Sequence, residues 1–398
     1  MTTLLISNVF PPAAGGSGRW FWELYRRLPR HDYVIAAGEH REAAEFDLTH
    51  DLQLERLPLA FESWGILGWS SIVSYNRAWR RLKRIVHTRN VQVIHAGCAL
   101  PEGWLAWLFH RRYGIPYAVY VHGEELQVFR SSRELTWLAR RVLRDAQLVI
   151  ANSENTAELL RSSWPVSAEV LKVFHPGVDT NYFQPVSCDP RIRERLGWFD
   201  RPVILMVGRL QRRKGHDVLI EALPAVKKAI PNVLCAIIGD GVERESLERL
   251  VEARGLREHV KFHGSVDDDL MRQAYQQCSL FALPNREVDG DFEGFGLVLL
   301  EAQACGRPVV TGLSGGTTET MSLGATGEAV DCTDAQSLAT KLISLLEDRT
   351  RLERMGVAAR KWTVDQFDWS SLASRAPQVF ALRNKASQPL SRHIANHT

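Results

Sequence analysis

The chain has 398 residues, with 49 lysines and arginines against 46 aspartates and glutamates and a formal net charge of +3. This length suits two domains of ordinary size, each with its own hydrophobic core, and the balanced charge gives no reason to expect a nucleic-acid partner. The six cysteines are scattered without the paired spacing of a metal site, so we expect reduced packing residues. The sequence has no signal-peptide pattern and no apolar run of membrane-spanning length, which predicts a cytoplasmic protein.

The chain opens with an apolar run over 4–10, a loop that contains Gly15, Gly16 and Gly18, and a helical pattern over 19–28. A strand, a glycine turn and a helix in this order begin many nucleotide-binding half domains. These glycines do not follow the dinucleotide G-x-G-x-x-G spacing, so the loop alone is weak evidence for any ligand.

Strands and helices then alternate through the first half of the chain. We expect helices around 70–87 and over 102–113, and strands over 33–37, 91–95, 117–121, 148–151 and 170–174. This alternation requires crossover connections and therefore predicts a parallel sheet with helices on both faces. A turn-rich linker over 184–190 should separate this domain from a second one.

Two histidines stand at the carboxyl ends of predicted strands, where the functional loops of parallel sheets lie. His95 precedes Ala-Gly, and His122 precedes Gly-Glu-Glu. A single histidine at a strand exit is more often structural than catalytic. Glu124 and Glu125, which follow, are candidates for acceptor contact or for capping the next helix.

The second domain begins with an apolar strand over 203–207 that ends at Gly208. Four cations follow before a helix over 217–229, and cations at the carboxyl end of a strand favour an anionic ligand. Arg209 directly follows the glycine and is a strong candidate for that role. A solvated basic loop is an adequate interpretation for Arg212 and Arg213, and Lys214 closes the run.

Further strands are expected over 233–238, 260–263 and 280–284. After them come a glycine loop, a short helix from Leu297 to Ala304 and a strand over 309–311. The free amide hydrogens and the positive dipole at the start of this helix favour a phosphate or a carboxylate. Glu301 lies inside the apolar helix, so it should either form an ion pair or bind a polyol such as a ribose.

Residues 293–310 follow the pattern E-G-F-G-x-x-x-x-E-A-x-A-x-G-x-P-V-V, which resembles the donor-site signature of family 4 retaining glycosyltransferases. Three shorter motifs resemble the same family: P-P-x-x-G-G over 11–16, H-G-E over 122–124 and G-R-L-x-x-x-K-G over 208–215. The resemblance is dense over 203–319 and sparse before it. It implies the α/β GT-B fold, in which two Rossmann-like parallel-sheet domains face each other across a cleft.

The resemblance also implies domain limits. Residues 1–185 would form the acceptor-side domain, completed by a helix over 366–390 that crosses back from the second domain. Residues 190–365 would bind the nucleotide sugar.

By resemblance, the catalytic residues would lie around the transferred sugar and the departing diphosphate: His122, Arg209, Lys214 and Glu293. The donor-binding residues would be Gly16, Gly208, Gly239, Val266, Gly294, Phe295, Gly296, Leu297 and Glu301. Within this set, Glu301 would take the ribose hydroxyls and the loop at Val266 would present backbone to the nucleobase. No metal cofactor is implied, because cations hold the diphosphate, and we therefore discount the D-x-D spacing of Asp289 and Asp291 as a metal site.

The motif set is similar to that of bacterial phosphatidylinositol-mannoside-type mannosyltransferases. This implies transfer of a hexose, with GDP-mannose favoured as donor, to a glycan or lipid-linked acceptor. UDP-glucose or UDP-N-acetylglucosamine are alternative donors. A sugar-nucleotide epimerase, a nicotinamide dehydrogenase and a catalytically silent relative are the remaining interpretations, and the E-x7-E pattern and the missing dinucleotide fingerprint argue against the first two.

Two stretches combine basic and aromatic residues, 20–27 and 77–84. Such stretches suit peripheral contact with the inner face of a membrane that carries a lipid-linked acceptor. Amphipathic helices with aromatic core faces explain them equally well.

Overall fold

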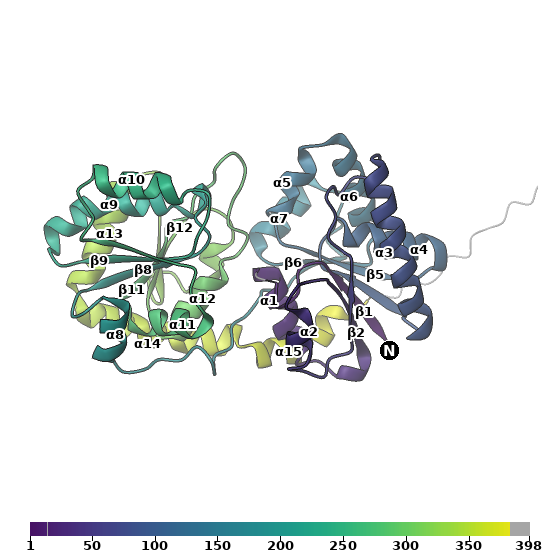
Figure 1. The fold of residues 1–398 in the computed structure, drawn as a ribbon, viewed down its shortest axis with the longest axis horizontal. Helices are drawn as coiled ribbons and strands as arrows, with labels where there is room; N and C mark the ends of the chain where they lie inside the picture. Colours follow the sequence, from purple (N-terminus) through teal and green to yellow (C-terminus); the bar gives the residue numbers. More distant parts are fainter. Residues whose placement is uncertain (14, 383–398) are drawn as a thin grey trace, which may run out of the picture.

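The computed structural model describes residues 1–13 and 15–382, and it has two lobes, each built on one parallel sheet (Figure 1). In the first lobe the strand order is β3-β2-β1-β4-β5-β6-β7. The strand bounds are β1 Thr3–Ser7, β2 Tyr33–Gly38, β3 Leu54–Leu57, β4 Val93–Ala96, β5 Tyr117–Val121, β6 Leu148–Ala151 and β7 Leu171–Val173. The sequence pattern predicted all of these except β3, which is short and only partly buried.

The second lobe has the strand order β10-β9-β8-β11-β12-β13. Its strands are β8 Val203–Val207, β9 Leu234–Ile238, β10 Val260–Gly264, β11 Leu280–Leu283, β12 Val309–Gly312 and β13 Gly327–Val330. Two parallel sheets in successive halves of the chain confirm the predicted α/β fold with two Rossmann-like domains.

Helices cover both faces of each sheet, as parallel sheets require. Those of the first half are α1 Gly16–Tyr25, α2 Ala43–Asp47, α3 Trp69–Thr88, α4 Glu102–Tyr113, α5 Glu125–Arg130, α6 Arg133–Asp145 and α7 Glu154–Ser163. Those of the second half are α8 Pro190–Leu196, α9 His216–Ala229, α10 Arg244–Ala253, α11 Asp268–Gln277, α12 Leu297–Ala304, α13 Ala335–Glu347, α14 Arg349–Phe367 and α15 Trp369–Phe380. No helix was predicted at α2, α6, α8, α10 or α11, and α1 begins three residues earlier than expected because Gly15, at φ +154°, is its N-cap.

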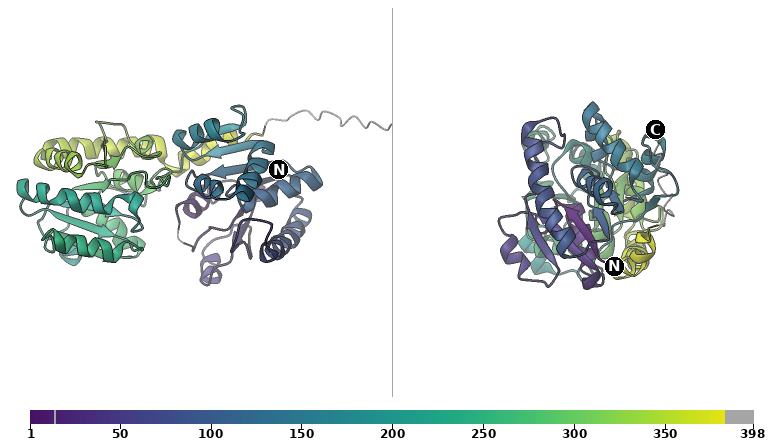
Figure 2. Two further views of the ribbon diagram at one scale, coloured as in Figure 1. Left: turned by 90° about the horizontal axis from the view of Figure 1, so that it is seen from above. Right: turned by 90° about the vertical axis from the view of Figure 1, so that its right-hand side faces the viewer.

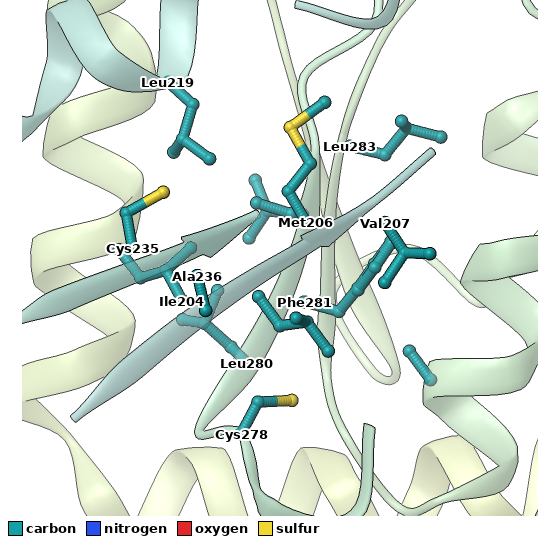
Figure 3. Close-up of a cluster of buried hydrophobic side chains, with 14 of the residues drawn as sticks. Ile204, Met206, Val207, Leu219, Cys235, Ala236, Cys278, Leu280, Phe281 and Leu283 are labelled. Atoms are coloured by element: carbon teal, nitrogen blue, oxygen red, sulfur yellow. The ribbon is translucent and has the colours of Figure 1, made fainter. Parts of the chain in front are cut away.

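Alternate residues of the central strands of the first lobe enter two separate cores. In β1, Leu4 and Ile6 pack with α3, α4 and α6, whereas Leu5 packs with α1 on the other face. The second lobe has one large core around β8, β9 and β11, part of which Figure 3 shows around Met206 and Phe281. Burial on both faces explains why these strands read as continuous apolar runs.

The last helix returns to the first lobe. In Figure 1, α14 lies along the lower side of the second lobe and α15 continues along the lower side of the first. Figure 2 shows the same yellow segment passing from one lobe to the other. Trp369 and Phe380 of α15 belong to the same core as Leu5 and Tyr120 of the first sheet. The helix predicted over 366–390 is thus divided at Asp368, and residues 383–390 lie outside the described residues.

The strand order reverses between β1 and β4 in the first sheet and between β8 and β11 in the second. Ligands of open α/β sheets bind in the crevice beyond the carboxyl ends of the strands at such a switch point. The loops after β1, β4, β8 and β11 are therefore the places where a site is expected.

Candidate active site

Glycine turns with positive φ follow β8 and β9, and the turn after β9 leaves no room for a side chain. Gly208 and Gly239 have φ values of +152° and +130°, and a Cβ at Gly239 would lie 2.1 Å from the carbonyl oxygen of Gly208. The Gly239 amide donates to the carbonyl of Gly264, 2.8 Å away, in the turn before Val266. Three of the predicted donor-binding positions therefore lie in consecutive loops along one edge of the second sheet.

Two helix N-termini, one from each lobe, meet near this edge. Gly296, at φ +92°, is the N-cap of α12, and a Cβ at Gly16, the first residue of α1, would lie 3.3 Å from Leu297 Cδ1. The ring of Phe295 stacks on His175, with the ring centroids 5.3 Å apart, so only its backbone is available to a ligand. Two positive helix ends facing one space favour a doubly charged anion such as a diphosphate.

Glu293 lies at the centre of a cluster of charges. Its Oε2 is 2.5 Å from Lys214 Nζ and 2.5 Å from Arg213 Nη1. Burial alone would raise the pKa of Glu293, but Lys214 and Arg213 outweigh it and hold the pKa below the usual value. The carboxylate is therefore ionised and fixed in orientation beside the glycine loop.

Arg213 is not a solvated loop residue, so that interpretation of the sequence is wrong. Its side chain is only 5% exposed, and it also contacts Glu124 Oε2 at 2.9 Å and Asp291 Oδ2 at 3.2 Å. Glu124 belongs to the first lobe, so Arg213 joins the two lobes at the site. The motif spacing could not reveal this role, because Arg212 and Arg213 are adjacent cations with opposite environments.

Arg209 differs from its neighbours because its side chain is exposed and has no ion pair in the described part of the chain. It directly follows Gly208 at the carboxyl end of β8, where a cation favours an incoming anion. Asp291, the second carboxylate of the D-x-D spacing, is engaged with Arg213. Within residues 1–13 and 15–382, no group of three acidic, histidine or cysteine side chains is arranged to hold a metal ion.

His122 follows β5 and lies where the lobes meet. Its Nε2 is 2.8 Å from the carbonyl oxygen of Gly97, and because a carbonyl only accepts, Nε2 carries the hydrogen. Nδ1 has no partner among the residues that the structure describes, so it is free to accept from a hydroxyl. A Cβ at Gly294 would lie 2.2 Å from the His122 carbonyl oxygen, which places the glycine loop directly against this histidine.

His95, the other histidine at a strand exit, is a core residue. It is 2% exposed, and Nδ1 lies 2.7 Å from the hydroxyl of Tyr25. Burial lowers the pKa of His95 to about 3, so it stays neutral in the folded protein.

Glu301 forms an ion pair, which is one of the two alternatives that its buried position predicts. Arg19 Nη1 of the first lobe lies 3.2 Å from Oε1, and the Tyr275 hydroxyl donates to Oε2 at 2.8 Å. Burial raises the pKa of Glu301, although Arg19 and Tyr275 act in the opposite direction. Arg19, like Arg213, is a charged residue at the site that the motifs did not single out.

The predicted site residues are thus brought to one place from both lobes. His122 and Gly16 come from the first lobe and meet the glycine loop with Glu293 and Lys214 of the second. Glu301 lies two turns into α12, and Val266 lies in the outermost of the three adjacent loops. Their roles toward a ligand remain predictions.

The architecture is that of the GT-B glycosyltransferases. HepE from Anabaena, solved in complex with UDP, has a TM-score of 0.80 at 23% identity, and the match covers 95% of this chain and 99% of that one. Two family models match the sequence: Glycosyltransferase Family 4 over residues 14–182 and Glycosyl transferases group 1 over residues 189–362.

Two curated relatives match almost from end to end. A GDP-mannose-dependent alpha-(1-6)-phosphatidylinositol monomannoside mannosyltransferase from Mycolicibacterium smegmatis is 34% identical over 97% of this chain and 100% of its own length. A protein of the same description from Mycobacterium tuberculosis is 31% identical over 94% of this chain and 96% of its own length. The chain belongs to glycosyltransferase family 4 and is a glycosyltransferase.

Proposed function

We propose that the protein transfers mannose from GDP-mannose to a hydroxyl of a glycan or lipid-linked acceptor, with retention of configuration and without a metal. The observation that carries this proposal is the proximity of the N-termini of α1 and α12 to each other, together with the cluster of Lys214, Arg213 and the ionised Glu293 at the glycine loop. The choice of donor rests on the two relatives described as GDP-mannose-dependent.

Charge stabilisation is the main chemical task of the site. As the bond from the sugar to the diphosphate breaks, negative charge grows on the departing phosphate, and positioned cations stabilise it most effectively away from bulk water. Lys214 is fixed by its ion pair with Glu293, and Arg209 is free to turn toward the diphosphate. The two helix N-termini would add amide hydrogens to the same oxygens.

Glu293 is poorly suited to be a covalent nucleophile. Arg213 and Lys214, each 2.5 Å from Oε2, reduce the nucleophilicity of its carboxylate. The same two contacts also fix the orientation of the carboxylate. We therefore assign it to binding hydroxyls of the transferred sugar, with the free Nδ1 of His122 accepting from another. In the proposed front-side displacement, a phosphate oxygen of the donor takes the proton of the acceptor hydroxyl as the new glycosidic bond forms.

Ligand-dependent stabilisation tests the donor first. A ligand that binds only the folded state raises the melting temperature according to its concentration relative to Kd. We expect a shift with GDP and a smaller or absent one with UDP and ADP. A higher melting temperature with UDP alone would show that the donor is a UDP-sugar. An unchanged melting temperature with all three nucleotides would overturn the proposal.

Transfer itself is tested with radiolabelled GDP-mannose and a phosphatidylinositol monomannoside acceptor, in buffer containing a metal chelator. We expect a mannosylated lipid product whose formation the chelator does not suppress. Loss of activity with the chelator, restored by a divalent cation, would contradict the metal-free mechanism. Release of an epimerised donor without acceptor would favour the epimerase instead.

A lipid-linked acceptor requires contact with a membrane, and α3 is suited to it. Arg77, Arg80, Arg81 and Arg84 are exposed there, without an ion pair in the described part of the chain, and the apolar side chain of Trp69 is 80% exposed at the start of the helix. In the other basic and aromatic stretch, Trp20, Phe21 and Tyr25 are buried in the core, so these side chains do not face a membrane. No helix in the described part of the chain is both long and apolar enough to cross a membrane.

Sedimentation with anionic and neutral vesicles at low salt tests this contact. We expect binding to anionic vesicles, with loss of binding when Arg80, Arg81 and Arg84 are replaced by glutamate. The matched control replaces three exposed cations of the second lobe by glutamate: Lys228, Arg249 and Arg354. Equal loss in the control, or no binding by the wild type, would contradict the membrane role of α3.

A further inference from the structure

Arg19 extends from its own lobe to the second. It lies in the first turn of α1, three residues after Gly16, yet its guanidinium is 5.3 Å from the centre of the Phe183 ring, which belongs to the core of the second lobe. Its single ion pair in the described part of the chain is the 3.2 Å contact with Glu301 on α12. The positive charge of Arg19 therefore acts mainly on Glu301, a carboxylate of the other lobe.

Glu301 is held by one donor from each lobe. Arg19 contacts Oε1, and Tyr275, on α11 of the second lobe, donates to Oε2 at 2.8 Å. A carboxylate has about four lone-pair positions, so two such partners leave two lone pairs that can accept from hydroxyls. Vicinal hydroxyls such as those of a ribose match this arrangement, and a carboxylate with both oxygens already anchored loses little freedom when it binds them.

We propose that Arg19 is a positioning residue of the donor site, supplied by the first lobe, which orients Glu301 so that it binds the ribose hydroxyls of the nucleotide. The inference rests on the proposed function, since it needs a nucleoside diphosphate as ligand. It adds that ribose recognition is complete only while the lobes are in contact, because Tyr275 alone would remain when they separate.

The environment of Glu301 explains why a cation is needed. Its side chain is 8% exposed, and burial disfavours the charged form of a carboxyl. A protonated Glu301 would have one oxygen that donates a hydrogen bond, so it could accept from one hydroxyl fewer than the ionised carboxylate. The guanidinium of Arg19 opposes this cost, and its rigid planar geometry fixes the direction of Oε1.

The test compares ribose and dideoxyribose. Binding of GDP and of 2′,3′-dideoxy-GDP is measured for the wild type and for Arg19→Gln, with the uridine pair run in parallel. Hydrogen bonds to charged groups imply that the wild type prefers the ribonucleotide by about 10- to 100-fold. In Arg19→Gln we expect this preference to fall at least about fivefold, with binding of the dideoxy ligand nearly unchanged.

Arg26→Gln is the matched control. Arg26 is the C-cap residue of α1, two turns beyond Arg19, and it pairs with Glu23 and Asp179 and not with Glu301. The ribose preference of Arg26→Gln should therefore equal that of the wild type. Arg19→Lys should restore part of the preference, and in a Glu301→Gln background Arg19→Gln should have no further effect.

The outcomes separate the two proposals. An unchanged ribose preference in Arg19→Gln, in a protein that binds GDP, overturns the role of Arg19 and leaves the proposed function standing. Failure of the wild type to bind any of the four nucleotides overturns the proposed function and this inference together. If Arg19→Gln does not fold, Arg19→Lys and the Tyr275→Phe variant, which removes the other anchor, carry the same comparison.

Discussion

His175 and Glu319 form a polar contact that helps to hold the lobes together. His175 Nε2, in the loop after β7, is 2.9 Å from Glu319 Oε2 in the second lobe. The same carboxylate accepts the backbone amides of Glu154 at 2.7 Å and Asn155 at 2.9 Å, at the start of α7. A carboxylate of one lobe thus caps a helix of the other, where the helix dipole favours negative charge.

This contact predicts acid sensitivity. Burial would raise the pKa of Glu319, but His175 and the two amides outweigh it and lower the pKa below the usual value of 4.5. Because the folded pKa is depressed, the stabilisation is complete above pH 4.5 and is lost as the pH falls below it. Glu319→Gln should cost about 1–2 kcal/mol at pH 7 and less at pH 3, measured by urea unfolding.

The control for this prediction is Glu347→Gln, because Glu347 is exposed at the end of α13. It should not change the pH profile. A loss in Glu319→Gln of equal size at pH 7 and pH 3 would show that the charge of Glu319 is not what stabilises the contact.

Lys214 should matter for the chemical step more than for binding. Lys214→Ala removes a fixed cation from the departing diphosphate, and loss of one such stabilising group commonly lowers kcat by about 100- to 1000-fold. Steady-state kinetics with the donor that the nucleotide-binding test identifies measure the change in kcat. Arg212→Ala, which removes the exposed neighbouring cation, should stay within about twofold of the wild type. Wild-type turnover in Lys214→Ala would remove its assigned role.

Arg213 should be important for stability as well as for activity. Arg213→Gln leaves Glu124, Asp291 and Glu293 without their shared partner, and removing one member of a buried ion pair costs about 3–5 kcal/mol. Lys214 still contacts Glu293, so we expect the lower end, about 3 kcal/mol, in urea unfolding. A cost no greater than that of Arg212→Gln would contradict the structural assignment of Arg213.

Gly294→Ala should prevent the lobes from closing. An added Cβ would lie 2.2 Å from the carbonyl oxygen of His122, and the Gly294 backbone is not left-handed, so the conflict comes from the other lobe alone. We expect transfer to fall at least about 100-fold, since a displacement of about 1 Å can cost that much. Small-angle scattering should show a larger radius of gyration.

Gly68→Ala is the control for this substitution, because a Cβ there meets only side-chain oxygens at 3.4 Å or more. Normal transfer by Gly294→Ala would mean that catalysis does not require the contact between the glycine loop and His122.

Glu102 should destabilise the protein at neutral and higher pH. Burial raises its pKa to about 7 in spite of the amide of Asn8, which donates to Oε1 at 2.8 Å, and Oε2 has no partner among the described atoms. Because the folded pKa is raised, the cost is absent below pH 4.5, grows as the pH rises and is complete above pH 7.

Glu102→Gln keeps an oxygen for the Asn8 amide and has no charge. It should therefore stabilise the protein by about 3 kcal/mol at pH 8 and leave it unchanged at pH 4, in urea unfolding. The exposed Glu62→Gln should have no effect at either pH. Destabilisation of Glu102→Gln at pH 8 would show that the ionised form is favoured in the folded state.

Local signals predicted many of the elements well. The bounds of α4, β5, β6 and α12 agree with the sequence patterns at both ends. For α12 the reason is visible, since Gly296 and Gly306 bracket a run of helix formers and each takes a positive φ. β3 and α2 were missed because neither shows a clear periodic alternation of apolar and polar residues, and both are short elements that depend on their neighbours in the fold.

The sequence by itself determined the two α/β domains, the glycine loops and the positions of His122, Lys214, Glu293 and Glu301, because strand ends, glycines and motif spacing are local properties. Only the tertiary structure decided which charges meet. Arg213 reaches Glu124 of the other lobe, Arg19 reaches Glu301, and Trp20 packs in the core instead of facing a membrane. These outcomes depend on contacts between residues far apart in the chain, and an arginine or tryptophan on an amphipathic helix has the same local pattern in either environment.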